Sequence, residues 1–134
     1  MGMRWSATVA GMALALWGAP GVAYEDYAPG EKLTLFNCGR CHVVSERNRM
    51  GSIGSTPSFP AIRNWDNWEY MTRSFYTRPP HRSFTQIEGV TEPFPIDRPP
   101  PIHPITLTLD EIDRIVDYLR TVPPKDLGGE LRLR

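Results

Sequence analysis

The sequence predicts a small all-α domain of three to four short helices joined by long loops. Three observations favour this class. A strongly amphipathic helix closes the chain over residues 107–122, no segment shows a strong strand pattern, and 14 prolines break the rest into short pieces. With 134 residues, a single domain is expected.

The first 23 residues predict a secretory signal peptide rather than part of the fold. An apolar stretch begins after Arg4 and ends in small residues at Ala23, a pattern that suits signal peptidase. The stretch is shorter than the roughly 20 residues of a spanning helix. We therefore expect a periplasmic domain over residues 24–134. An uncleaved N-terminal membrane anchor is the alternative.

The charge balance of the expected mature chain excludes one class of partner. Cleavage removes a single charged residue, Arg4, so 15 basic and 15 acidic residues become 14 and 15. A near-neutral chain offers no electrostatic basis for binding nucleic acid.

Two helices are expected before the middle of the chain. The first spans Glu31–Asn37, and a polar, Gly/Pro-rich loop over residues 45–60 follows. The second is expected from Trp65 to about Thr77, with Asn64 as its N-cap. Its inner face is expected to contain Trp68, Met71, Thr72 and Phe75.

Residues 81–104 form the most unusual segment. Six of the twelve positions from Pro93 to Pro104 are proline. Because proline lacks a backbone donor and has a fixed φ, this run predicts an extended, stiff strap rather than a helix or an inner strand.

The closing helix has the clearest signals. Thr108 and Glu111 form a capping box, and acidic residues in the first turn suit the helix dipole. Apolar residues then recur at helical spacing, and prolines end the helix. The expected buried face consists of Ile112, Ile115, Val116 and Leu119.

The two cysteines stand in the sequence Cys38-Gly39-Arg40-Cys41-His42. Cys-x-x-Cys-His is the attachment signature of a c-type haem. Thiols three positions apart share one turn and can bond both vinyl groups of one porphyrin, while the following histidine reaches the iron. The pattern predicts one covalent haem c, held by Cys38, Cys41 and His42.

Other interpretations of this motif are weaker. A disulfide between the two cysteines would close too short a loop to stabilise the fold. A thioredoxin-like dithiol usually follows a strand, whereas a helix is expected here. A zinc site needs a second pair of ligands, and the only other histidines are His81 and His103.

The chain resembles the class I (mitochondrial-type) cytochromes c over most of residues 28–122. The resemblance implies an all-α cytochrome c fold around one haem. It is carried by the haem motif and by weaker matches in the same order. These matches are Gly30, Phe36, Pro57, Phe59 and Tyr118-Leu119 in the closing helix.

The resemblance also implies roles for some of these residues. In that family the first and last helices cross closely, which would place Gly30 and Phe36 against Tyr118. The carbonyl of a loop proline accepts a hydrogen bond from the proximal histidine. Pro57 is the matching position, with Pro60 as the alternative, and such a bond orients the imidazole.

The sixth iron ligand departs from the family pattern. The family usually has a methionine shortly before the last helix, and here Pro101-Ile102-His103-Pro104 holds that place. We therefore expect His103 to be the distal ligand and the reduction potential to lie below that of His/Met cytochromes. Met71 is the main alternative. His81, Met50 and an open site follow.

Trp65 and Arg63 are candidates for the buried haem propionate. In related cytochromes an indole N–H and an arginine often contact it. The alternative is that the tryptophan is ordinary core and the arginine is solvated.

The leading expectation is therefore a periplasmic electron carrier rather than an enzyme. Its partners would be soluble or membrane-bound redox proteins, and it would associate with the membrane only if the N-terminal segment is retained. One alternative is a haem subunit of an oxidoreductase complex. Another is a haem enzyme or gas sensor with an open iron site.

Overall fold

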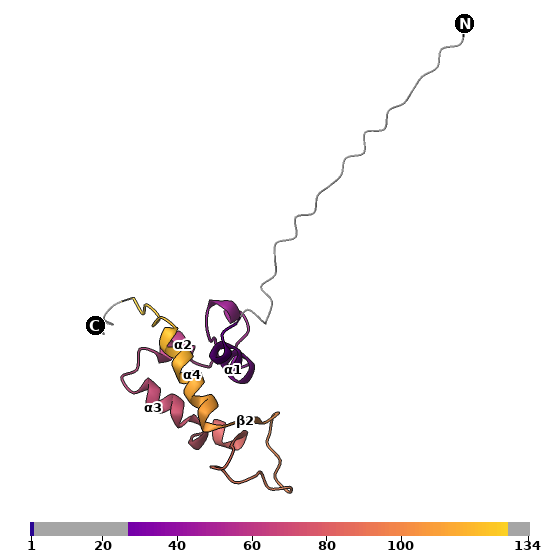
Figure 1. The fold of residues 1–134 in the computed structure, drawn as a ribbon, viewed down its shortest axis with the longest axis vertical. Helices are drawn as coiled ribbons and strands as arrows, with labels where there is room; N and C mark the ends of the chain where they lie inside the picture. The colour runs from indigo at the N-terminus through magenta and orange to yellow at the C-terminus, as the bar shows by residue number, and fades with distance from the viewer. Residues whose placement is uncertain (2–26, 129–134) are drawn as a thin grey trace.

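The computed structural model describes Met1 and residues 27–128, which form a mostly helical domain (Figure 1). It has four α-helices in this part of the chain, so the helical prediction is confirmed. They are α1 (Pro29–Cys38), α2 (Phe59–Ile62), α3 (Trp68–Arg73) and α4 (Leu109–Thr121). Short 3₁₀ turns are η2 (Glu46–Asn48), η3 (Phe75–Thr77) and η4 (His81–Ser83).

The expected signal peptide, residues 1–23, lies outside the described residues apart from Met1. In the described part, no helix has both the length and the apolar character needed to cross a membrane.

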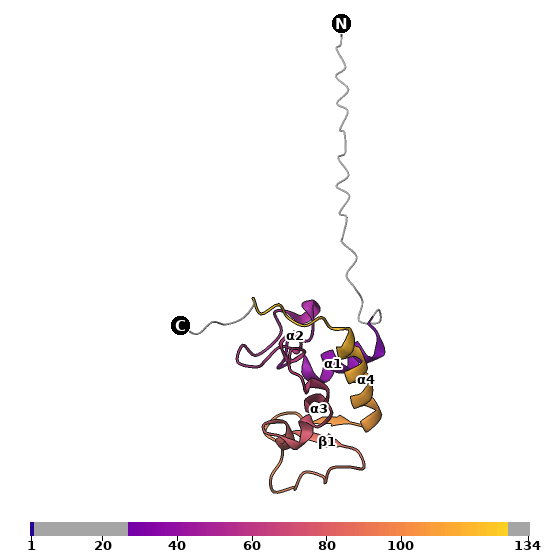
Figure 2. The same cartoon turned by 90° about the vertical axis from the view of Figure 1, so that its left-hand side faces the viewer.

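Helices α1 and α4 cross in the most extensive contact between any two elements (Figure 2). Gly30 lies at the crossing. A Cβ added there would come within 2.5 Å of the Arg114 carbonyl oxygen and 2.9 Å of Tyr118 Cβ. The predicted glycine contact is therefore confirmed. Phe36 does not share it, because that ring is 76% exposed.

Glu31 connects three segments beside this crossing. The Tyr118 hydroxyl of α4 donates to its carboxylate at 3.3 Å, and Arg47 Nε lies 3.2 Å from the same oxygen. Burial raises the pKa of Tyr118, which keeps the hydroxyl protonated as a donor. A buried carboxylate needs such partners.

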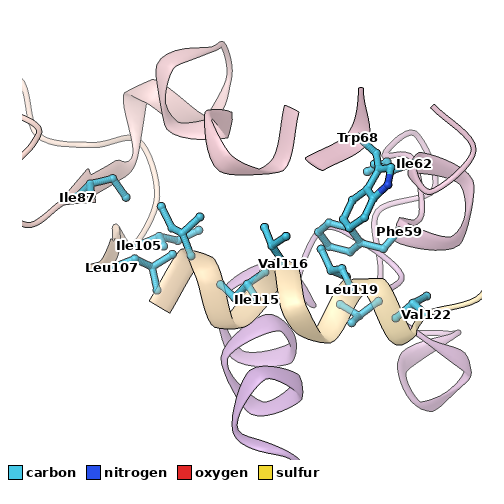
Figure 3. Packing of buried hydrophobic residues seen from close by; sticks show 12 residues of the cluster. Phe59, Ile62, Trp68, Ile87, Ile105, Leu107, Ile115, Val116, Leu119 and Val122 are labelled. Carbon is cyan, nitrogen blue, oxygen red and sulfur yellow. The ribbon is translucent and has the colours of Figure 1, made fainter. Parts of the chain in front are cut away.

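Helix α4 forms as the sequence predicts. The Thr108 hydroxyl accepts from the Glu111 amide at 3.1 Å, and the Glu111 carboxylate accepts from the Thr108 amide at 2.8 Å. Its four predicted apolar residues are all buried. Figure 3 shows Phe59 and Trp68 near one end of α4 and Ile105 near the other. One core therefore runs along this helix.

The middle of the chain differs from the prediction in two places. Helix α3 begins at Trp68, and Asn64 instead donates to the carbonyls of Pro60, at 3.2 Å, and Lys125, at 3.1 Å. Helix α2 starts where a loop was expected. The Ser58 side chain caps it, and Pro60 suits its first turn.

A small parallel sheet corrects the expectation of a purely helical fold. Strand β1 (Thr85–Ile87) pairs with β2 (Ile105–Leu107), with Thr85 opposite Ile105. Three-residue strands are too short to give a periodic signal in the sequence. The sheet joins both ends of the proline-rich strap, which extends from the body as a loop (Figures 1 and 2).

We predict that Gly30→Ala destabilises the protein by about 1–3 kcal/mol, because the new methyl group overpacks the helix crossing. Urea unfolding measures this change. Gly54→Ala is the matched control, since no atom lies within 4 Å of its added Cβ. Equal stability of the two variants would contradict a close crossing.

The Thr85 hydroxyl is buried without a hydrogen-bond partner in the described part of the chain. We predict that Thr85→Val stabilises the protein by about 1 kcal/mol, because it removes an unpaired polar group at constant shape. Thr91→Val should destabilise it, since the Thr91 hydroxyl accepts from the Ile87 amide at 2.9 Å. Thermal unfolding of both variants tests the contrast. Destabilisation by Thr85→Val would contradict it.

Candidate functional site

The Cys-x-x-Cys-His motif forms one tight turn at the end of α1. Cys38 is the last residue of the helix, and the amides of Cys41 and His42 both donate to its carbonyl, at 3.1 and 2.9 Å. All three side chains line the same cavity. The structure therefore brings the three predicted attachment residues together.

Both thiols are free in the structure. Burial, and to a lesser extent the neighbouring Cys41, raises the pKa of Cys38 to about 12. Reactive dithiols need a pKa lowered to about 3.5–7.5 so that a thiolate is present. The raised pKa of Cys38 is the opposite of what an attacking thiol needs, so Cys38 is poorly suited to that role. Among residues 27–128, no three His, Cys, Asp or Glu side chains gather as a metal-binding group.

The imidazole of His42 has a fixed orientation. Its Nδ1 lies 2.7 Å from the carbonyl oxygen of Pro57, the partner that the sequence favours over Pro60. A carbonyl only accepts, so Nδ1 carries the proton. Burial lowers the pKa of His42, so the ring is neutral and Nε2 keeps its lone pair. A neutral imidazole oriented in this way is a suitable metal ligand.

The Asn48 side chain forms hydrogen bonds with the backbone of the motif and of the residues after it. No sequence pattern indicates this role. Its side-chain nitrogen donates to the His42 carbonyl at 2.9 Å, and its oxygen accepts from the amides of Val44, at 2.7 Å, and Ser45, at 3.1 Å. The contact spans six residues and has no local sequence signature. Asn48 thus fixes the backbone at the end of the Cys-x-x-Cys-His motif and directly after it.

A cavity of about 220 Å³ lies over the motif. It exceeds the engineered cavity of roughly 150 Å³ that stays open in a packed core. Protein interiors are otherwise close-packed, so a space of this size suits an apolar ligand. Its apolar walls include Phe59, Ile62, Phe75, Phe84, Ile112 and Ile115.

His81 and Met71 also line this cavity. His81 comes from η4, and its ring centre lies 6.0 Å from that of His42. Met71 comes from α3 and is half-buried. The sequence offers both as alternative ligands, and the structure places both beside the proximal histidine.

His103 does not reach the cavity. It is exposed, and it lines a separate hollow with Phe36 and Arg40. Arg40 donates to its carbonyl at 3.2 Å. The strap returns here to the sheet edge, two residues before β2. The expected ligation of iron by His103 is therefore not supported. Met50 is 90% exposed and does not line the cavity either.

The two propionate candidates separate in the structure. Trp65 lines the cavity although it is 42% exposed. Arg63 does not line it, because its Nε donates to the Val122 carbonyl at 3.2 Å, at the end of α4. Its guanidinium also stacks on Trp68 at 4.1 Å. The expected propionate contact of Arg63 is therefore not supported.

Arg78 places a positive charge at the wall of the cavity, which Arg63 does not line. Of the described residues that line the cavity, it alone carries a full charge. Its Nη1 donates to the Met71 carbonyl at 3.3 Å, and its guanidinium lies over Tyr70 at 5.2 Å. A planar guanidinium at this wall can pair with a carboxylate.

Comparisons with known proteins add nothing to this geometry, since no family model, curated protein or solved structure matches the chain. The resemblance to the class I cytochromes c rests on the residues quoted above.

We predict that Asn48→Ala destabilises the protein by about 1–3 kcal/mol, because four side-chain hydrogen bonds are lost, one of them to the Gly39 carbonyl at 3.4 Å, and partly buried backbone groups stay unpaired. Asn67→Ala is the control, since the Asn67 side chain makes no capping hydrogen bond. Denaturant unfolding checks the difference. A loss no larger than that of the control would show that Asn48 does not hold the motif.

Proposed function

We propose that this protein is a monohaem c-type cytochrome that transfers single electrons. One haem would be bonded to Cys38 and Cys41, with His42 as the proximal iron ligand. One observation carries this proposal: both thiols and the imidazole of His42, which the Pro57 carbonyl orients, line the same apolar cavity.

The walls of the cavity suit a flat, apolar group with acidic substituents. Aromatic and aliphatic side chains form most of the cavity wall, and Arg78 can pair with a propionate. The hydrogen bond to Pro57 orients His42 and increases its basicity. When bound, haem supplies an iron that gains or loses one electron.

Electron exchange requires one edge of the site to be accessible to a partner. Trp65 and Pro57 both line the cavity and are exposed, so this wall reaches the protein surface. Redox proteins of the periplasm or its membranes are the proposed partners. The proposed export depends on residues 1–23, which lie outside the described part apart from Met1.

An open-site enzyme or gas sensor is less well supported than an electron carrier. Such a protein needs a free coordination position opposite the proximal histidine. Here a second imidazole, that of His81, lines the same cavity, with its ring centre 6.0 Å from that of His42. No observation favours the oxidoreductase-subunit alternative over a free carrier.

The test is production of the full chain in a bacterial host with the maturation machinery for c-type cytochromes. We predict a coloured protein that retains haem after denaturation, gains the mass of one haem, and titrates as a one-electron couple. The Cys38→Ser/Cys41→Ser double variant should retain no haem after denaturation, because both thioether bonds are lost.

A host without that machinery provides the control, because the same chain should stay free of haem there. A colourless product with the polypeptide mass alone, from the competent host, would refute the proposed function. A product with bound zinc or a stable disulfide between the two cysteines would also refute it.

A further inference from the structure

We propose that His81 is the distal ligand, so that His42 and His81 bind one iron from opposite sides. This inference rests on the proposed haem attachment and deepens it. The two histidines are 39 positions apart in the sequence, yet both line the same cavity.

The separation of the rings fits a shared metal. Their centroids are 6.0 Å apart, and their planes differ by 11°. Two imidazole nitrogens on opposite sides of one metal, each about 2.0–2.1 Å from it, place their ring centres about 6 Å apart. The centre-to-centre separation of the two nearly parallel rings thus matches that of a bis-imidazole site.

The surroundings of His81 hold its ring without satisfying its polar atoms. Phe75 meets the ring edge-on at 5.2 Å, and Phe84 lies 5.7 Å away. Neither ring nitrogen has a hydrogen-bond partner in the described part of the chain. The ring nitrogens are not among the buried unpartnered atoms of the described residues, so they remain accessible to a ligand in the cavity.

The backbone of His81 is anchored on both sides. The Phe84 amide donates to the His81 carbonyl at 3.0 Å, and the Arg82 amide donates to the Arg78 carbonyl at 3.0 Å. Strand β1 begins directly after Phe84 and pairs with β2. A ligand on so short and tied a turn loses little conformational entropy on binding.

The competing ligands are less well placed. His103 lies outside the cavity, and Met50 is exposed. Met71 lines the cavity as well, from α3. His81 is distinguished by a ring centre 6.0 Å from that of His42 and by a nearly parallel ring plane.

The spectra of the haem-loaded wild-type protein give the first test. We expect a low-spin ferric haem without the far-red charge-transfer band of methionine ligation. Because the ring planes are nearly parallel, electron paramagnetic resonance should show a rhombic signal, not the single large-g signal of perpendicular imidazoles. The methionine band would overturn the proposal.

Variants identify which residue binds the iron. His81→Ala should convert the ferric haem to high spin and let the ferrous form bind carbon monoxide, and added imidazole should restore low spin. His103→Ala is the matched control, because His103 lies outside the cavity, and it should keep the wild-type spectrum. Met71→Leu should keep that spectrum too. His81→Met should raise the reduction potential.

The outcomes separate this inference from the proposed function. Absence of covalent haem from the wild-type protein would refute the function itself. Covalent haem whose low-spin spectrum survives His81→Ala but is lost in Met71→Leu or His103→Ala would refute His81 alone. If His81→Ala yields no folded protein, the wild-type spectra still decide between histidine and methionine, and His103→Ala then decides between the two histidines.

Discussion

The crossing of α1 and α4 determines where the attachment residues lie. Gly30 is at the crossing and Cys38 ends the same helix, about 12 Å further along at 1.5 Å per residue. Any change in the angle or depth of the crossing therefore displaces both thiols relative to the cavity. Because Gly30 leaves no room for a side chain, the packing of two helices and the chemistry of the site depend on the same contact.

Helix α4 links the core to the cavity as well. Ile112 and Ile115 line the cavity, whereas Val116 and Leu119 are fully buried in the core. The helix follows β2 through the Thr108 cap, and β2 in turn holds the segment that carries His81. One amphipathic helix thus fixes the distance between the proximal turn and the opposite wall.

Local signals made α4 and the turn of the Cys-x-x-Cys-His motif predictable. Each of these signals is complete within a few residues: the capping box at Thr108, and the spacing of Cys38, Cys41 and His42. Residues close in the sequence therefore determine both local structures. The sequence favours His103 as distal ligand and Met71 as the main alternative, yet it is His81 and Met71, and not His103, that line the cavity beside His42. Which histidine lies beside His42 depends on a three-residue strand pairing, and pairing between distant segments has no local signature.

That pairing also separates the cavity from the strap. The Ile105 amide donates to the Phe84 carbonyl at 2.8 Å, so the strap leaves and rejoins the body at nearly the same place. The entropy lost on closing a loop rises only slowly with the length of the loop. The strap between β1 and β2 can therefore be long with little loss of stability. Its residues include the fully exposed Ile96. Since His81 precedes the excursion and His103 ends it outside, the geometry opposite His42 does not depend on the path of the strap. The proposed ligand, His81, thus belongs to the anchored turn and not to the strap.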